Sequence, residues 1–325
     1  MEAAARDGIG RLARSAGWRG RPAETKGDNM QTLRKVLEEA DAKGVAVGHF
    51  NVADLVTLNA VLEAARELKV PVVVGASEGE RKFMGVRQVA AVVKSLREEY
   101  DFPIFLNADH THSLESAIEA AKAGFDWVVF DVSTLPFAEN VRETKNAVET
   151  LKKLRPDILV EGEIGDIGSG SEIHDKAPDL QKGLTSPAQA KEFLEATGID
   201  TLAPAVGNMH GMLKSMVAGG ARKHLDIERI RAIKTETHAL MTLHGGSGTD
   251  DHDFLEAISA GMTVVHINTE VRLAWRHGLD AALAKESQEI VPYKLLPPVG
   301  DAVKQVVSAR LKLFNEGRLS RPAGV

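Results

Sequence analysis

Eight short runs of apolar, often β-branched residues alternate with helical patterns along the chain, and this alternation is the strongest constraint on its fold. The runs cover residues 45–50, 70–77, 103–109, 127–133, 158–165, 201–207, 239–245 and 263–270. Each run is almost continuously apolar, as expected for a parallel strand that is covered by helices. Eight such strand–helix units in succession predict an α/β fold, the closed (β/α)8 TIM barrel.

The segments between the runs place apolar residues three or four positions apart, which predicts helices. Residues 186–198 show this pattern with clear boundaries. Ser186 can cap that helix, Pro187 suits its first turn, and Gly198 suits its end. Residues 301–317 predict one extra helix after the eighth unit, which would cap the barrel or pack on a second subunit.

A doubly wound open sheet is the alternative architecture. Such a sheet usually has fewer units and a glycine-rich dinucleotide turn after its first strand, whereas the first run here is followed by HFNVADL. We therefore expect residues 29–325 to form a single barrel domain. Residues 1–28 lack a strong apolar period and predict a flexible N-terminal extension, and their acidic residues argue against a targeting peptide.

The composition excludes several classes of function. The chain has no cysteine, so any metal must be held by histidines and carboxylates, and disulfides and thiolate catalysis are excluded. The net charge of −6 gives no basic footprint for nucleic acid. No apolar run approaches the roughly 20 residues that span a bilayer. We expect a cytoplasmic enzyme that binds neither nucleic acid nor a membrane.

Three histidines follow apolar runs at the expected carboxyl ends of strands. They are His110 in PIFLNADH, His210 in TLAPAVGNMHG and His244 in ALMTLHGGSG. Because active sites of barrels form at this end, we expect the three imidazoles to converge. Three imidazoles with one open position are a ligand set of catalytic zinc, and such sites also accept cobalt, manganese or iron. His49, by contrast, is expected to be a surface or packing residue.

Several carboxylates occupy similar positions. Adjacent residues at a strand end point to different sides, so Asp109 could act as a base while His110 binds metal. Glu161 and Glu163 share one strand face, and a carboxylate inside a barrel is costly unless it is paired or near a metal. We expect one of them to join the site and the other to be buried against a lysine or arginine. Asp131 is a comparable candidate.

Two features indicate a phosphate-binding site. The run HGGSG, which begins at His244, offers consecutive backbone N–H groups and a hydroxyl ahead of a helix, an arrangement suited to phosphate. Residues 166–185 and 208–225 form loops longer than most connections of this kind, and such loops are often lids or binding loops.

The motifs DH, ExEIG, GxxHGxxK and HGGSG occur in this order, together with GHFNV, VVVGASEG and INTE. Over about residues 30–316, this ordered set resembles the class II, metal-dependent fructose-bisphosphate aldolases and their tagatose-bisphosphate relatives. The resemblance implies a zinc enzyme that reversibly cleaves a ketose 1,6-bisphosphate, most simply fructose 1,6-bisphosphate, into dihydroxyacetone phosphate and glyceraldehyde 3-phosphate.

The resemblance also implies roles for individual residues. It makes His110, His210 and His244 the zinc ligands, with Glu163 and Asp131 as carboxylates near the metal, one of which can serve an alternative metal position. It makes Asp109 the acid/base at the C4 hydroxyl and Glu172 the mobile proton carrier at C3. The implied substrate- and phosphate-binding residues are Asn51, Ser77, Gly211, Lys214, Gly245, Ser247, Asn268 and Thr269. It further implies a homodimer or homotetramer and allows a monovalent cation as a second cofactor.

The chain departs from the family pattern at several positions. The usual HxDH motif reads Asn107-Ala108-Asp109-His110, and Leu213 replaces the usual tyrosine after HG. His266 stands where many members have asparagine. The spacing from Glu163 to Glu172 is one residue longer than in the usual family motif. These changes predict a divergent branch in which the substrate could differ.

Three other functions remain open at the level of sequence. A metal-dependent sugar-phosphate epimerase or isomerase would share the metal and phosphate residues but leave the carbon chain intact. A Schiff-base aldolase would need a lysine at a strand end, and none of the eight runs ends in one. A non-catalytic phosphosugar-binding protein would need neither Asp109 nor a metal.

Overall fold

The computed structural model describes residues 31–316 apart from positions 169, 171, 176–182 and 221, so the expected extension at 1–28 lies outside it. Eight parallel strands form a closed barrel in the order β1-β10-β9-β7-β5-β4-β3-β2. They are β1 Val47–Asn51, β2 Val72–Ala76, β3 Ile104–Thr111, β4 Trp127–Phe130, β5 Leu159–Ile164, β7 Thr201–Pro204, β9 Leu240–Leu243 and β10 Met262–Ile267. All eight predicted strands and the predicted barrel are confirmed.

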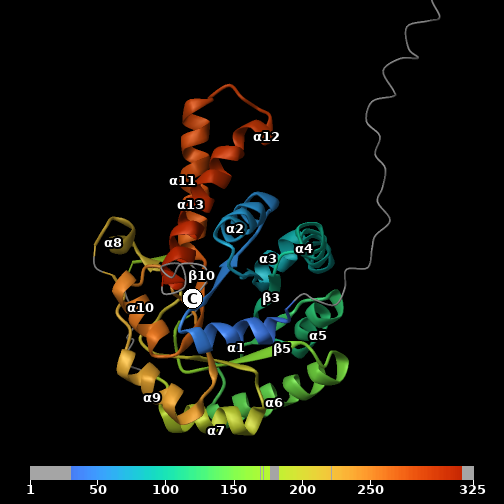
Figure 1. Ribbon diagram of the computed structural model, residues 1–325, viewed down its shortest axis with the longest axis vertical. Coiled ribbons are helices and arrows are strands. Elements are labelled where there is room, and N and C mark those ends of the chain that lie inside the picture. Colours follow the sequence, from blue (N-terminus) through green and yellow to red (C-terminus); the bar gives the residue numbers. More distant parts are fainter. Residues whose placement is uncertain (1–30, 169, 171, 176–182, 221, 317–325) are drawn as a thin grey trace, which may run out of the picture. The chain divides into compact units, whose positions relative to one another are not determined.

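Helices surround the barrel between successive strands (Figure 1). They are α2 Leu55–Leu68, α3 Glu78–Met84, α4 Val86–Tyr100, α5 Leu114–Ala123, α6 Phe137–Leu154, α7 Pro187–Thr197, α9 Ile227–Thr237, α10 Asp251–Ser259 and α11 Thr269–Lys285. The predicted boundaries of α7 are confirmed: the Ser186 hydroxyl accepts a hydrogen bond from the backbone N–H of Gln189, and Gly198 ends the helix with a φ of 70°. None of the described helices is long and apolar enough to cross a membrane.

The interior of the barrel changes character along the strands. At the amino ends of the strands, the buried side chains of α1 (Leu33–Lys43) pack against the interior of the barrel. The buried apolar residues of this end are Leu33, Val36, Leu37, Ala40, Val45, Val47, Val73, Phe105, Trp127, Leu159 and Val264. Two residues further along the same strands the buried side chains are polar, and they include His49, Asn107, Glu161 and His266. The strand ends at this second face carry the predicted site.

In the described residues after the last strand, β10, three helices follow: α11, the short α12 (Pro292–Leu295) and α13 (Pro297–Phe314). The predicted extra helix is therefore present, although it begins four residues earlier than residue 301. Figure 1 shows α11 and α13 side by side, and α13 also packs on α2. This C-terminal hairpin covers the outside of the barrel next to β1.

The two long loops predicted from the sequence are joined to each other. A two-residue strand in the first, β6 (Ile173–His174), pairs with β8 (Met212–Leu213) in the second, and α8 (Lys214–Val217) follows directly. Gly211 permits this approach, because a Cβ atom there would lie 2.3 Å from the carbonyl oxygen of Glu172. The pairing brings the loop after β5 next to the loop that carries His210.

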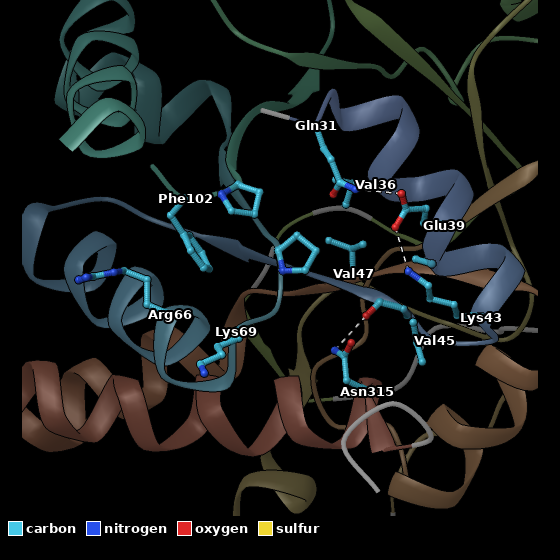
Figure 2. Close-up of a pocket in the computed structure, with 14 residues that line it drawn as sticks. Gln31, Val36, Glu39, Lys43, Val45, Val47, Arg66, Lys69, Phe102 and Asn315 are labelled. Atoms are coloured by element: carbon cyan, nitrogen blue, oxygen red, sulfur yellow. Dashed lines mark hydrogen bonds and ion pairs between the residues drawn. The ribbon is translucent and has the colours of Figure 1, made fainter. Parts of the chain in front are cut away.

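A cavity of about 470 Å³ opens at the amino ends of β1, β2 and β3 (Figure 2). Apolar side chains such as Val36 and Val45 form part of its wall, and Glu39 forms an ion pair with Lys43 at 2.9 Å on its rim. This end of a barrel generally serves stability, whereas catalytic residues lie at the carboxyl ends of the strands. The size of this cavity therefore does not identify it as the active site.

Candidate active site at the carboxyl ends of the strands

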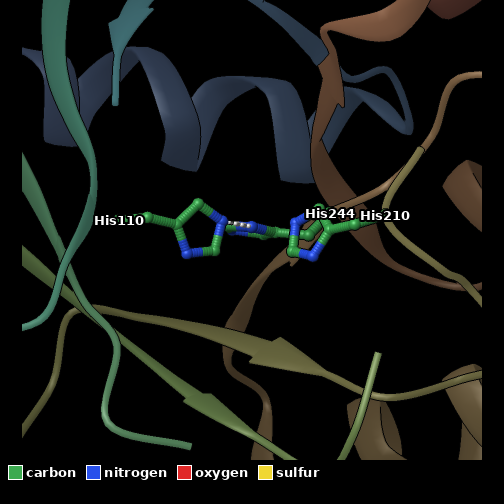
Figure 3. A group of neighbouring side chains, drawn as sticks. All are labelled: His110, His210 and His244. Carbon is green, nitrogen blue, oxygen red and sulfur yellow. Dashed lines mark hydrogen bonds between the residues drawn. The ribbon is translucent and has the colours of Figure 1, made fainter. Parts of the chain in front are cut away.

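His110, His210 and His244 meet at the carboxyl ends of the strands (Figure 3). His110 Nε2 lies 2.9 Å from His244 Nδ1, and the His210 ring centroid lies 4.9 Å from that of His110 and 5.9 Å from that of His244. Two nitrogen ligands of a tetrahedral zinc ion are about 3.3 Å apart, given bonds of about 2.0–2.1 Å. The expected convergence is confirmed, and the spacing fits a single ion.

Each of the three imidazoles has its outer nitrogen held by an oxygen atom. His110 Nδ1 lies 2.9 Å from an Asp131 carboxylate oxygen, and His210 Nδ1 lies 2.8 Å from the carbonyl oxygen of Gly168. His244 Nε2 lies 2.6 Å from the Glu161 carboxylate. Such outer partners fix the ring orientation and the tautomer of metal-binding histidines. The remaining nitrogens of His110 and His244 face each other at 2.9 Å, and each of the three rings places a ligand atom within 4.8 Å of the other two.

The backbone of β3 is distorted at Asp109 and His110, two of the predicted site residues. The pairing of β3 with β4 shifts between Ala108 and Thr111, and His110 has a φ of 94°, which is strained for a side chain of this type. The simple alternation expected for Asp109 and His110 is therefore broken. Both side chains line the same pocket, with an Asp109 oxygen 3.7 Å from His110 Nε2.

Glu161 and Glu163 both lie buried on β5. Glu161 contacts His244, and its second oxygen accepts hydrogen bonds from the hydroxyls of Thr201 and Thr242. The expectation that one of these glutamates is buried against a lysine or arginine is thus wrong for Glu161. The reason is that the neighbouring strands β7 and β9 already supply hydroxyl donors and an imidazole at that height of the barrel.

The donor set fits a bound divalent metal. One Glu163 carboxylate oxygen, Oε2, is buried without a hydrogen-bond partner among the described residues, and it lies 3.7 Å from His244 Nδ1. Burial raises the pKa of Glu163 well above its usual value, and the negative charge of Asp131 adds to the effect. A buried carboxylate oxygen without a donor is costly, and a nearby cation relieves that cost.

The protonation states of the histidines also favour a bound metal ion. Burial and the charge of His110 lower the pKa of both His210 and His244 to about 3, which keeps them neutral. Burial also acts to lower the pKa of His110, but the carboxylates of Asp109 and Asp131 outweigh it and raise this pKa to about 10. The carboxylates thus favour a positive charge at His110. A metal cation would supply that charge through neutral imidazole ligands.

Asp109 is held in its ionised form beside this cluster. Its carboxylate accepts a hydrogen bond of 2.8 Å from the Asn51 side chain and lies 3.3 Å from His266 Nδ1. Burial acts to raise the pKa of Asp109, but His110 and His266 overcome burial and lower this pKa well below its usual value. An ionised carboxylate that lines the pocket can accept a proton from a bound hydroxyl group.

Asn107 and His266, two of the residues that depart from the family pattern, both contact His49. Its Nε2 lies 3.1 Å from the Asn107 side-chain oxygen, and its ring stacks on His266 at 3.4 Å between centroids. His49 is a buried packing residue, as expected, and Gly75 leaves the space for its ring. The third departure, Leu213, lies in β8 and pairs with His174, away from this stack.

The pocket between the histidines has a volume of about 20 Å³, enough for one ion or water molecule. It is lined by Asn51, Asp109, His110, His210, Gly211, His244, Gly245, Ser247, His266, Asn268 and Thr269. Six of the predicted substrate-side residues therefore lie at the pocket. The Ser247 hydroxyl accepts hydrogen bonds from the backbone N–H groups of Asn268 and Glu270, which ties the turn after β9 to the turn after β10.

Five predicted residues lie outside this lining: Asp131 and Glu163, which contact the histidines as described above, and Ser77, Lys214 and Glu172. Ser77 caps α3, because its hydroxyl accepts a hydrogen bond from the backbone N–H of Glu80. Lys214 is exposed and forms an ion pair with Asp175 at 2.7 Å. The Glu172 side chain is exposed on the loop that β6 joins to β8. The roles of these residues, like those of the other predicted site residues, stay predictions.

Two buried cations of this face, Arg81 and Lys223, were not predicted from the sequence. Arg81 donates hydrogen bonds to the carbonyl oxygens of Ala76 and Asp109 and to the Thr111 hydroxyl, and so supports the distorted end of β3. Lys223 donates hydrogen bonds to backbone carbonyls beneath the pocket. Neither residue stands in a motif or at a strand end, and isolated basic residues generally lie in solvent. The sequence held no signal for their burial.

Comparisons with known proteins agree with this fold. The family model for fructose-bisphosphate aldolase class-II matches residues 31–318. A probable fructose-bisphosphate aldolase of Bacillus subtilis (strain 168) is 35% identical over 290 residues, which cover 88% of this chain and 97% of that protein. A fructose-bisphosphate aldolase of Thermus caldophilus is 35% identical over 306 residues, covering 88% of this chain and 98% of that protein.

A solved structure of the YdjI aldolase from Escherichia coli K12 aligns with a TM-score of 0.75 at 29% identity, covering 89% of this chain and 98% of that chain. The fold and the site define a (β/α)8-barrel lyase with a histidine cluster that fits a metal ion. The chain belongs to the class II fructose-bisphosphate aldolase family. It is an aldolase, and its family generally depends on a metal and acts on small sugar phosphates.

Proposed function

We propose that this protein is a zinc-dependent aldolase that reversibly cleaves a ketose 1,6-bisphosphate, with fructose 1,6-bisphosphate as the expected substrate and dihydroxyacetone phosphate and glyceraldehyde 3-phosphate as products. The main support is the meeting of three oriented imidazoles with the ionised Asp109, whose oxygen lies 3.7 Å from His110 Nε2. A zinc ion on His110, His210 and His244 would act as a Lewis acid for the negative charge that develops as the C3–C4 bond breaks.

Asp109 is proposed as the base that takes the proton of the C4 hydroxyl. Its position supports this role, since Asn51 and His266 hold the carboxylate while it still lines the pocket. Glu172 is proposed as the proton carrier at C3. Its exposed side chain must then swing toward the pocket, and the pairing of β6 with β8 keeps its backbone beside Gly211 during that movement.

The phosphate groups are proposed to bind on the turns after β7, β9 and β10. A pocket of about 20 Å³ holds no sugar, so the substrate would extend outward from the metal over these turns. Gly211, Gly245, Ser247 and Thr269 offer backbone N–H groups and hydroxyls there, and Thr269 opens α11, whose amino end favours an anion. Asn268 completes this rim, while Ser77 and Lys214 are proposed as outer substrate contacts.

Glu163 and Asp131 are proposed to serve an alternative metal position. Together with His110 they place one ligand atom each within 4.8 Å of one another. Zinc is the expected ion because imidazole nitrogens suit it, and cobalt, manganese and iron are the expected substitutes.

The decisive experiment measures release of triose phosphate from fructose 1,6-bisphosphate by the purified protein, first untreated, then with a chelator, then with zinc restored. Cleavage that is lost with the chelator and returns with zinc would establish the proposal. Tagatose 1,6-bisphosphate is assayed beside it to fix the C4 preference. A folded, zinc-loaded protein that cleaves neither substrate, or that epimerises without cleavage, would overturn it.

The role of Asp109 has a separate test. Asp109→Ala is expected to retain zinc and to lower kcat by roughly 10²- to 10⁴-fold, the usual contribution of a positioned acid/base group. Asp253→Ala is the matched control, since Asp253 pairs with His224 away from the pocket. A normal kcat in Asp109→Ala would remove the residue from the mechanism.

The setting of the enzyme is part of the same proposal. We infer a single-domain protein over residues 29–325 that works in the cytoplasm, without nucleic acid or membrane partners. We also infer a homodimer or homotetramer. Ile290 and Tyr293, between α11 and α13, are 87% and 78% exposed, which is unusual for large apolar side chains and suits a contact with a second copy.

A further inference from the structure

Lys223 is a buried lysine beneath the pocket. It is 3% exposed and lies four residues before the start of α9. Its Nζ donates hydrogen bonds to the backbone carbonyl oxygens of Met209 at 2.8 Å, Gly211 at 2.6 Å and Gly245 at 2.9 Å. Gly211 and Gly245 also line the pocket. The ammonium group thus joins the undersides of the two turns on which a phosphate is proposed to bind.

The backbone of Lys223 is fixed to the second of these turns. Its N–H donates to the carbonyl oxygen of Gly248 at 3.0 Å, and the N–H of Asp250 donates to its own carbonyl oxygen at 3.2 Å. These bonds form a short bridge beside Thr249. The lysine therefore has a defined position relative to the HGGSG segment. Its side chain extends from there to the three carbonyl oxygens.

The positive charge of Lys223 lacks a carboxylate partner among the described residues, because the three hydrogen-bond acceptors are all neutral carbonyls. Burial lowers the pKa of this lysine to about 7, and the negative charge of Glu270 opposes the shift only in part. A buried ammonium group without a counter-charge is costly. An anion on the adjacent turns would complete the arrangement.

Converging backbone carbonyls also form the ligand set with which proteins hold monovalent cations. We propose that the Lys223 ammonium group occupies such a position as a built-in cation and supplies the positive charge for the substrate phosphate bound over Gly211 and Gly245. This inference rests on the proposed function, and it deepens it. It predicts that the enzyme needs no free potassium, sodium or ammonium, although the family resemblance allows such a cofactor.

The test compares the zinc-loaded wild-type protein with Lys223→Met in potassium, ammonium or tetramethylammonium chloride at equal ionic strength. For the wild type, we expect the same KM for fructose 1,6-bisphosphate in all three salts. In Lys223→Met, KM should rise by roughly tenfold or more, the effect of losing a hydrogen-bonded charge. Its kcat should change less, and potassium or ammonium should restore part of the loss.

Lys234→Met is the matched control. Lys234 is a partly buried lysine that donates to the carbonyl oxygen of Ala239 and pairs with Asp41, on the α1 side of the barrel. Its loss should affect stability without changing KM or creating a response to potassium. A purely structural role of Lys223 would likewise lower stability without a salt-specific rescue.

A binding measurement separates this proposal from the proposed function. Calorimetric titration with inorganic phosphate should show weaker binding to Lys223→Met than to the wild type, whether or not the protein cleaves a ketose bisphosphate. Equal phosphate affinity in folded Lys223→Met would overturn the inference. So would a wild-type KM that depends on potassium or ammonium. If Lys223→Met does not fold, Lys223→Gln takes its place in the same kinetic and phosphate-binding measurements.

Discussion

The two ends of the barrel interior are built from the same strands, but one end buries apolar side chains and the other buries polar and charged ones. On β5, Leu159 belongs to the apolar end, while Glu161 and Glu163, two and four residues further, are buried carboxylates. On β3, Phe105 lies at the apolar end and Asp109 lines the pocket. One end satisfies its side chains by packing on α1. The other concentrates groups that are costly to bury.

This difference assigns stability to one end and chemistry to the other. Burial of the apolar end contributes the favourable transfer of side chains from water, at about 25 cal/mol per Å². At the other end, burial raises the pKa of both Glu161 and Glu163, so keeping them ionised opposes folding unless a cation is present. Changes at the two ends should therefore be separable by experiment.

The largest effect is expected at the polar end. His244→Ala removes a candidate metal ligand and leaves Glu161 without its imidazole partner. We expect loss of bound zinc and a fall in kcat/KM of at least about a thousandfold, because the metal contributes several kcal/mol to transition-state stabilisation. Metal analysis and the cleavage assay check this result. A variant with full zinc content would remove His244 from the ligand set.

The apolar end should show the reverse response. Leu37→Ala leaves a cavity in the interface between α1 and the barrel, where Leu37 is fully buried. The free energy of unfolding should fall by about 2–5 kcal/mol. Zinc content and kcat of the folded fraction should stay unchanged. Denaturant titration and the cleavage assay measure both, and a changed kcat would show that the two ends are coupled.

Glu161→Gln probes the polar end without removing a ligand. Glu161 holds His244 Nε2 at 2.6 Å, and the amide would replace a carboxylate acceptor by a weaker one. Zinc affinity should fall roughly 10- to 100-fold, as is typical when an outer partner of a metal-binding histidine is changed. Competition with a chromophoric chelator measures it. Unchanged zinc affinity would mean that the main role of Glu161 is to accept the hydrogen bonds from its threonine partners.

The smallest effect concerns stability against pH in the metal-free protein. The pKa of Glu163 is raised in the folded state, so its contribution to stability is lost as pH rises above the value of an unfolded glutamate. Metal-free Glu163→Gln should therefore lose less stability between pH 5 and pH 8 than the wild type, with a Tm at pH 8 higher by on the order of 2 °C. Equal pH profiles in thermal scans would contradict it.

Local patterns were sufficient for the barrel because each parallel strand is buried on both sides and reads as an apolar run. The capped helix α7 followed from Ser186, Pro187 and Gly198 for the same reason, since caps depend on neighbours in sequence. The strand-end histidines could also be predicted, because all carboxyl ends of the strands face one side of a barrel.

Contacts between strands could not be predicted in this way. The Glu161–His244 pair and the His49–Asn107 pair join residues 83 and 58 positions apart. Which side chains meet depends on the register of neighbouring strands and on closure of the barrel, and neither is encoded in local periodicity. The shared side of Asp109 and His110 likewise depends on the positive φ at His110, which no pattern indicates.

The sequence by itself thus determined a (β/α)8 barrel and the three strand-end histidines, because burial and strand direction act residue by residue, and its ordered motifs indicated the family. The tertiary structure decided which partners orient those histidines and which lysine contacts the turns at Gly211 and Gly245. By motif, Lys214 was the candidate, but it is exposed, whereas Lys223 is buried against three carbonyls. A buried charge is fixed by the groups that surround it, and only the folded chain assembles them.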